Sequence, residues 1–282
     1  MRLFLFAALL AASSACFAQP PTGKFSAETA VFRTIDFPGA INTLVDGINN
    51  KGMIVGCYTD KNANTHGFTF VNGTILRYDH PRSSFNGAYG INDNGVIVGT
   101  FSTTLQLPYQ SINGKFKQVP IIQGFAADIN NSGVIVGSYY DVCCTLHGYL
   151  YAGGQFTFID YPGATRTFLD GINSAGVASG FWEDATFAHH GFTWNNGTFT
   201  SFDVPGAIST SAIKINSSNT IVGYYRDSSS VDHGFMLQNG IYTTVDFPGA
   251  ASTQINAIND LGMIVGDYVD ASGVMHGFLG HP

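Results

Sequence analysis

Five histidines in the chain each follow an aspartate, and this combination of residue types could bind a metal ion or transfer protons. Each histidine stands six positions after its aspartate and directly before a glycine and an aromatic residue. The pairs are Asp60 with His66, Asp141 with His147, Asp184 with His190, Asp227 with His233, and Asp270 with His276.

A further copy of the same pattern has lost both residues, with Thr103 and Leu107 in their places and a shorter loop between them. This joint loss predicts that each aspartate and histidine hydrogen-bond across the base of a loop, which fixes the imidazole tautomer. Equivalent sites in a ring of repeats lie well apart, so the five pairs cannot converge on one metal ion. The alternative is a separate metal or ligand contact in each repeat.

A second recurring carboxylate stands two residues before a proline. It occurs as Asp36, Asp79, Asp160, Asp203 and Asp246, with Gln118 at the sixth site. An aspartate before a Pro-Gly turn is predicted to accept backbone N–H groups of that turn. The spacing shows no pair of carboxylates of the kind that glycosidases use, and we therefore predict no catalytic residue.

These residues recur because the chain repeats one pattern six times. The repeat is marked by Pro38, Pro81, Pro120, Pro162, Pro205 and Pro248, with spacings of 43, 39, 42, 43 and 43 residues. Periods of about 40 to 45 residues with strand-like content are typical of β-propeller blades. Helical arrays of similar period need helical patterns, which are absent here.

One repeat contains the sequence signals of four strands. In the second copy, residues 88–91 and 96–99 flank a polar turn, and in the fourth copy residues 191–194 and 199–202 flank a turn with Asn-Gly. The first turn ends in Gly in five copies and in Asn219 in the remaining one, which predicts a left-handed backbone there. The sequence thus predicts an all-β, six-bladed β-propeller of four-stranded antiparallel blades.

The two ends of the chain are out of phase with the repeat. The run Val31–Ile35 matches the fourth strand of a unit, whereas the final run, residues 276–278, matches the third. We predict that the N-terminal strand completes the last blade and closes the ring, which would leave no open sheet edge at that seam.

Binding is expected where the repeats differ. Two adjacent positions of the first strand vary in type from copy to copy, and first strands commonly line the channel of a propeller. The predicted ligand-contacting residues are Asp46, Tyr89, Asp128, Asp170, Lys214 and Asn256. Polar groups of mixed charge suit a small polar ligand, and the alternative is that they are solvated residues that fill the channel.

The N-terminus has the pattern of a secretory signal. Residues 1–18 contain a positive start, an apolar run and a small-residue region before Gln19. We expect cleavage after Ala18, then an extension over residues 19–30 and a single propeller domain over residues 31–282. No later apolar run reaches about 18 residues, so we expect a secreted or periplasmic protein without a membrane span.

Three cysteines remain after the predicted cleavage. Cys143 and Cys144 are adjacent and could form a vicinal disulfide, or one of them could bridge to Cys57. The alternative is three free thiols without a redox role. Metal-type spacing of the Cys-x-x-Cys kind is absent, and we expect no metal and no cofactor.

Charge excludes some partners. The net charge is −7 and only 11% of the residues are charged, without a basic run. Nucleic acids and anionic membranes attract clustered Lys and Arg, so neither is expected as a partner. We expect a monomer.

The repeated pattern resembles a known family. Gly-Ile-Asn-x-x-Gly-x-Ile-Val-Gly, then Tyr-x-Asp and His-Gly-Phe, is similar to the bacterial extracellular HAF repeat over about residues 31 to 280. This chain departs from that signature in having Gly between the His and the aromatic residue. The resemblance implies an exported repeat protein and carries over no catalytic residue.

We therefore expect a non-catalytic binding or interaction scaffold, with a glycan or another exported protein as partner. The alternative is a propeller-type enzyme, a lyase or hydrolase, acting on carbohydrate or a small polar substrate at the channel mouth. Nucleophile and phosphate-binding motifs are absent. A third alternative is a structural component of the cell envelope.

Overall fold

The computed structural model describes residues 22–24, 31–81 and 83–281, and no residue in these ranges is helical. The predicted signal segment lies outside the described residues. Five units follow the chain in order. Their strands are β3 (Asn42–Ile48), β4 (Ile54–Thr59), β5 (Thr65–Val71) and β6 (Thr74–Arg77); β7 (Phe85–Ile91), β8 (Val96–Ser102), β9 (Gln106–Ile112) and β10 (Lys115–Gln118); β11 (Gly124–Ile129), β12 (Ile135–Tyr140), β13 (Leu146–Ala152) and β14 (Gln155–Ile159); β15 (Arg166–Ile172), β16 (Ala178–Glu183), β17 (His189–Asn195) and β18 (Thr198–Phe202); and β19 (Ser209–Ile215), β20 (Ile221–Arg226), β21 (Asp232–Gln238) and β22 (Ile241–Thr244).

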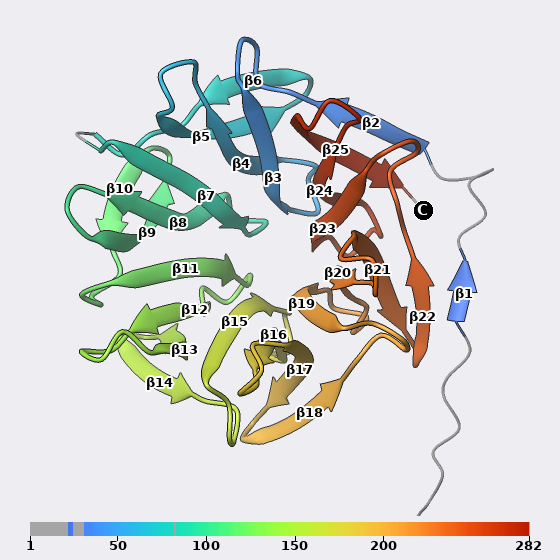
Figure 1. Ribbon diagram of the computed structural model, residues 1–282. Coiled ribbons are helices and arrows are strands. Elements are labelled where there is room, and N and C mark those ends of the chain that lie inside the picture. The colour runs from blue at the N-terminus through green and yellow to red at the C-terminus, as the bar shows by residue number, and fades with distance from the viewer. Residues whose placement is uncertain (1–21, 25–30, 82, 282) are drawn as a thin grey trace, which may run out of the picture.

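The sixth unit draws on both ends of the chain. Strands β23 (Ser252–Ile258), β24 (Ile264–Val269) and β25 (Met275–His281) form a sheet with β2 (Val31–Ile35), which pairs antiparallel with β25. A further strand, β1 (Thr22–Lys24), adds in parallel to the outer edge of β22. The sequence did not predict β1, because it falls in the segment interpreted as an extension. The units surround a common centre (Figure 1).

Each unit is an antiparallel meander, and its first turn depends on backbone conformation. In the turn after β3, the N–H of Gly52 donates to the carbonyl oxygen of Asn49 at 3.1 Å, and Gly52 has φ +74°. Asn219 takes φ +59° at the same place in the fifth unit. Asn tolerates this left-handed region better than most residues, so the exchange of Gly for Asn is conservative. The turn prediction is confirmed.

Aromatic side chains of the third strands fill the spaces between units. One ring per unit is almost fully buried, at the position after the His-Gly pair or its equivalent. These rings are Phe68, Tyr109, Tyr149, Phe192, Phe235 and Phe278. Each core cluster also includes residues from a neighbouring unit; Val55 of β4, for example, packs against Ala88 and Ile91 of β7. Burial of large rings dominates the free energy of such packing.

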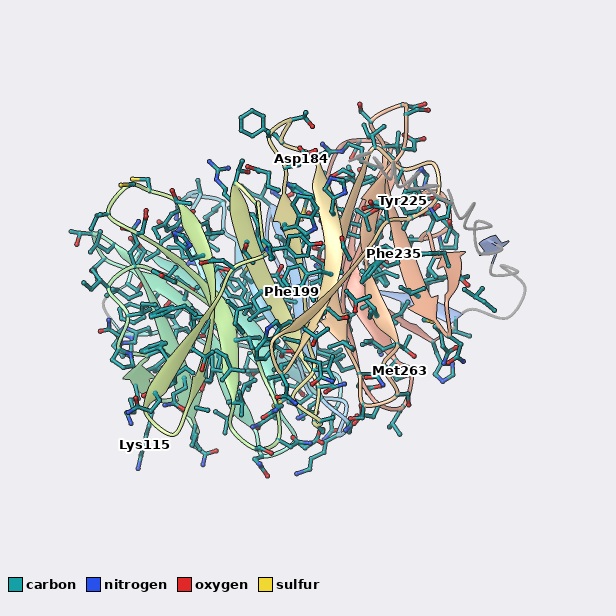
Figure 2. All side chains as sticks on the ribbon, turned by 90° about the horizontal axis from the view of Figure 1, so that it is seen from below. Lys115, Asp184, Phe199, Tyr225, Phe235 and Met263 are labelled. Atoms are coloured by element: carbon teal, nitrogen blue, oxygen red, sulfur yellow. The ribbon has the colours of Figure 1, made fainter. Side chains whose placement is uncertain are left out.

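The two faces of the molecule carry different loops. In the edge-on view, Asp184 lies at one edge, and Lys115 and Met263 lie at the opposite edge (Figure 2). Asp184 begins the loop between the second and third strands of its unit, whereas Met263 follows the turn between β23 and β24. We call these the loop face and the turn face.

Candidate functional site

A β-bulge recurs in the first strand of every unit. In β3 the register with β4 shifts between Val45 and Gly47, so Asp46 is an extra residue without a partner on the neighbouring strand. Equivalent shifts occur in the other five first strands. The bulged residues are Asp46, Tyr89, Ala127, Asp170, Ile213 and Asn256. A bulge redirects a side chain relative to the regular alternation of a strand.

All six bulged residues line one central cavity. The cavity measures about 280 Å³ and is also lined by Lys214 and by three phenylalanines, Phe125, Phe168 and Phe181. The first strands approach one another closely beside it: a Cβ added to Gly171 would lie 2.7 Å from the carbonyl oxygen of Ile213. Of the six residues predicted to meet a ligand, five line this cavity. The sixth, Asp128, lines an adjoining narrower pocket on the turn face, which shares Lys214.

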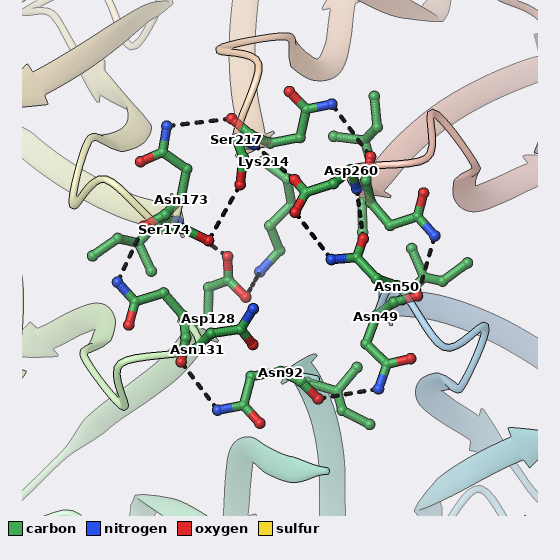
Figure 3. A pocket seen from close by; sticks show the side chains of 18 of the residues that line it. Asn49, Asn50, Asn92, Asp128, Asn131, Asn173, Ser174, Lys214, Ser217 and Asp260 are labelled. Atoms are coloured by element: carbon green, nitrogen blue, oxygen red, sulfur yellow. Dashed lines mark hydrogen bonds and ion pairs between the residues drawn. The ribbon is translucent and has the colours of Figure 1, made fainter. Parts of the chain in front are cut away.

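Lys214 lies between the two spaces and joins three units. Its ammonium donates to the backbone carbonyl of Ala127 at 2.6 Å and to that of Asp170 at 2.8 Å, and it lies 3.4 Å from Oδ1 of Asp128. The other oxygen of Asp128 accepts the N–H of Ile172 at 3.1 Å. Figure 3 shows Lys214 and Asp128 pointing toward each other. The charge is buried but paired, which makes Lys214 a fixed support rather than a free ligand-binding group.

Asp46 contributes a carboxylate to the cavity wall, beside the thiol of Cys57. Its Oδ2 is buried and has no hydrogen-bond partner among the described residues. Next to it, Asp267 of β24 accepts the N–H of Val45 at 2.8 Å and the side-chain amide of Asn256 at 2.6 Å. Burial raises the pKa of Asp46, and burial together with the charge of Asp46 raises the pKa of Asp267. An acceptor left unpaired in this way favours a ligand that brings a donor.

Burial also shifts the pKa of Asp170, at the cavity wall, and the pKa of Cys57, behind that wall. It raises the pKa of Asp170 to about 7, although the positive charge of Lys214 opposes the shift. It also raises the pKa of Cys57, next to Asp46, which keeps the thiol protonated. The three cysteines within the described residues are free, with Cys57 buried and the Cys143–Cys144 pair exposed. The disulfide alternatives are therefore not what the structure contains.

Six asparagines encircle the axis at the turn face. The side-chain amide of each donates to the backbone carbonyl of the next, from Asn49 to Asn92 at 3.0 Å and from Asn259 back to Asn49 at 3.1 Å. The ring comprises Asn49, Asn92, Asn130, Asn173, Asn216 and Asn259 (Figure 3). Each side-chain oxygen also accepts two N–H groups of its own turn, as in Asn173, where both bonds measure 3.0 Å. The recurring Asn therefore links neighbouring units, a role that the sequence pattern alone did not indicate.

Each of the five histidines of the Asp–His pairs lies between two carboxylates: the loop aspartate is 3.3 to 3.7 Å from Nε2, and a second aspartate is closer, at Nδ1. Nε2 of His66 lies 3.3 Å from Asp60, while its Nδ1 lies 2.9 Å from Asp79, the residue before the Pro turn. The same 2.9 Å contact recurs at the other four histidines. The interpretation of the second carboxylate as a turn acceptor was therefore wrong: the turn is closed by its own backbone, as in Ala40 N–H to Phe37 O at 3.1 Å.

One sequence signal could have revealed this arrangement. Gln118, which replaces the second carboxylate, lies at the end of β10, in the same unit that has Thr103 and Leu107 in place of the Asp–His pair. All three residues are thus lost together from one unit. Within the described residues, no group of three or more His, Cys, Asp and Glu side chains is arranged to hold a metal ion. The described part of the chain also contains no helix long and apolar enough to cross a membrane.

Comparison with known proteins identifies the fold. No protein-family model matches the chain, and no curated protein matches it. Among solved structures, a fungal lectin from Aleuria aurantia, described as a six-bladed β-propeller with a fucose recognition mode, is similar with a TM-score of 0.52 and 10% identity over 84% of this chain and 91% of that one. SapL1 lectin, solved with α-methyl fucoside, is similar with a TM-score of 0.56 and 10% identity over 85% and 93%. AofleA from Arthrobotrys oligospora is similar with a TM-score of 0.54 and 11% identity over 94% and 88%. The chain therefore has a β-propeller fold.

Proposed function

We propose that this chain is an exported, non-catalytic β-propeller scaffold whose central cavity binds a small polar ligand of the kind a glycan presents. The observation that carries the proposal is the buried, unpartnered Oδ2 of Asp46 at the wall of the cavity. A native structure retains an unsatisfied buried acceptor at a cost, and a turn of the Asp46 side chain toward the cavity would let a ligand hydroxyl or amine supply the missing donor.

The cavity lining matches such a ligand in its other groups. Asp170 and Asn256 add side-chain oxygens, while Phe125 and Phe168 provide apolar surface. Sugars combine hydroxyl edges with apolar C–H faces, and aromatic rings commonly contact those faces. Similar folds have been solved with fucosides, which makes neutral glycans the first class of ligand to test.

We also propose that the propeller is a closed ring with β2 as the closing strand and that the chain acts as a monomer. The pairing of β2 with β25 and the bond from Asn259 to Asn49 support the closure. Asp36, which follows β2, lies 2.9 Å from His276 and adds a polar contact at the same seam.

Export remains part of the proposal. It rests on the signal pattern of residues 1–18 and on the resemblance to the HAF repeat. Expression with its own N-terminus in a bacterial host, followed by fractionation and N-terminal sequencing, tests it. We expect a mature protein beginning at Gln19 in the periplasm or the medium, and an intact Met1 in the cytoplasm would refute export.

Binding at the cavity is tested by following the melting temperature while neutral oligosaccharides are titrated. We expect a saturable rise and no turnover, and Asp46→Asn should weaken the binding because the amide replaces one acceptor with a donor. Asp246→Asn is the matched control, since it makes the same chemical change at an exposed carboxylate that does not line the cavity. Equal effects of the two variants, or no saturable shift with any sugar, would refute the proposal.

A specific observation also favours the enzyme alternative. Asp46 and Asp170 line the same cavity and both have pKa values raised toward neutrality by burial. A carboxyl group with such a pKa suits general acid–base catalysis near neutral pH. Hydrolysis or elimination of a bound oligosaccharide, abolished by Asp170→Asn in a protein that stays folded, would establish this alternative over the scaffold.

A further inference from the structure

A second pocket lies on the loop face, between the fourth and fifth units. It measures about 350 Å³ and is lined from two sides: Phe187 and His189 come from the fourth unit, and Tyr224, Arg226 and Asp232 come from the fifth. Ser209, at the start of β19, lies between them and accepts the backbone N–H of His189 at 3.1 Å. None of these residues lines the central cavity.

Arg226 and Asp232 form a rigid charged pair in this pocket. The guanidinium donates to both carboxylate oxygens, from Nε at 2.7 Å and from Nη2 at 3.1 Å. Gln254 of the sixth unit donates to the same carboxylate at 2.9 Å, so Asp232 is held from both sides. About half of the Arg226 side chain stays exposed, which leaves further N–H donors for a ligand.

This pair belongs to one unit only. The equivalent positions in the first unit, by strand register, are Thr59 and Thr65, which directly oppose each other as Arg226 and Asp232 do. A charged pair is therefore not needed to build the hairpin.

The other polar groups of the pocket carry no charge at neutral pH. Burial lowers the pKa of His189, so its imidazole is neutral, and Nδ1 of His189 lies 3.0 Å from the hydroxyl of Ser211. Burial also raises the pKa of Tyr224, so its hydroxyl stays protonated. Arg226 and Asp232 cancel each other, and Glu183, which lies 3.9 Å from Nε2 of His189, is paired with Arg166 at 3.5 Å. The residues that line the pocket therefore carry no net charge but offer donors and acceptors.

Phe187, at the rim of the pocket, has an unfavourable backbone conformation and an exposed aromatic side chain. Its side chain is 71% exposed and its backbone lies in the left-handed region, with φ +66°. The same loop position is small in every other unit that keeps this loop. The equivalent residues are Ala63, Cys144, Ser230 and Gly273. A bulky residue at positive φ is strained, and an exposed aromatic ring makes no contact with the core. Phe187 therefore does not contribute to the stability of the fold.

We propose that this pocket binds one neutral sugar unit, separately from the central cavity. The apolar face of the ring lies against Phe187, and adjacent hydroxyls exchange hydrogen bonds with Arg226 and Asp232. The absence of net charge favours a neutral sugar over an acidic or amino sugar, and the aromatic rim beside a planar donor–acceptor pair matches a molecule with one apolar face and a polar edge.

The test uses two variants built from residues that other units already tolerate. Phe187→Gly copies the sixth unit, and the double variant Arg226→Thr with Asp232→Thr copies the first unit. The probe is an array of immobilised neutral monosaccharide glycosides, with glucuronate and glucosamine glycosides and short peptides on the same array. Free methyl glycosides then compete to give affinities.

We expect the wild-type protein to retain neutral glycosides, and each variant to bind them at least 10-fold more weakly. Phe187→Gly should melt at the same or a higher temperature, because glycine relieves the strained backbone. Asp46→Asn should leave the affinity of this pocket unchanged, which separates it from the cavity proposed above. Binding of no neutral glycoside, preference for charged sugars or peptides, or full affinity in Phe187→Gly would overturn the inference.

Discussion

Replacing Asn259 by Ala tests whether the ring of asparagines holds the first and last units together. The side chain is buried, donates to the carbonyl of Asn49 at 3.1 Å, and accepts the N–H groups of Leu261 at 3.0 Å and Met263 at 2.9 Å. Alanine removes all three hydrogen bonds. At about 1 kcal/mol for each bond, the free energy of unfolding falls by about 3 kcal/mol. For a domain of this size that corresponds to a melting temperature lower by about 6 to 12 °C.

A matched variant separates the contribution of the hydrogen bond between units from that of the two hydrogen bonds within the turn. Asn130 has the same three kinds of bond, to Asn173 at 3.1 Å, and from Ser132 at 3.1 Å and Val134 at 3.0 Å. In a closed ring, Asn130→Ala and Asn259→Ala lower the free energy of unfolding by the same amount. If the ends of the chain were apart, Asn259→Ala would cost about 1 kcal/mol less, because its bond to Asn49 would be missing.

The assay is urea unfolding followed by circular dichroism, with the slope of the transition compared between variants to check that unfolding stays cooperative. Ser174→Ala is the control, since Ser174 is exposed and makes a single hydroxyl contact at 3.2 Å; we expect a change below about 0.5 kcal/mol. A loss below about 1 kcal/mol for Asn259→Ala would refute the reasoning.

Three further predictions concern Asp170, the closing strand β2 and the Asp–His contacts. Burial raises the pKa of Asp170 to about 7, above its value of about 4 in the unfolded chain, so the folded state binds this proton more tightly and stability falls as pH rises from about 4 to 7. Allowing for solvent in the cavity, Asp170→Asn should reduce this pH-dependent loss of stability by about 2 kcal/mol. The measurement is the melting temperature of both proteins as a function of pH, and the same pH dependence in both would contradict the prediction. Deleting residues 29 to 38 removes β2 and should lower the melting temperature or the solubility strongly; unchanged values would show that β2 does not close the ring. Because the Asp–His contacts satisfy the imidazoles within the protein, Zn²⁺ or Ca²⁺ should not shift the melting temperature, and a saturable rise would restore the metal interpretation.

Regular repetition explains why much of the fold could be predicted. The period of the prolines, the Asn-x-x-Gly turns and the alternating aromatic residues are local signals, and local signals determine strands and turns. Asn219 is the clearest case, since its place in a series of glycines predicted a left-handed backbone, and the structure has φ +59° there. The phase of the two chain ends likewise predicted the pairing of β2 with β25.

Contacts across strands were harder to predict, because they depend on register and packing. His66 and Asp79 lie on neighbouring segments of one hairpin, yet nothing in their spacing of 13 residues shows that they touch. Asp267 and Cys57 face the cavity residues from second strands, and the sequence analysis considered first strands only. Phe181 was missed for the same reason.

The sequence by itself determined the repeat, the strand order within each unit and the set of variable first-strand positions, because these depend on residue type and spacing along the chain. Only the tertiary structure decided which variable residues share a space. It placed Asp128 beside Lys214 at the narrower pocket, left one oxygen of Asp46 without a hydrogen-bond partner, and brought Phe187 and Arg226 from adjacent units to one pocket. These residues are far apart in the chain, and the packing of whole sheets around the axis determines the distances between them.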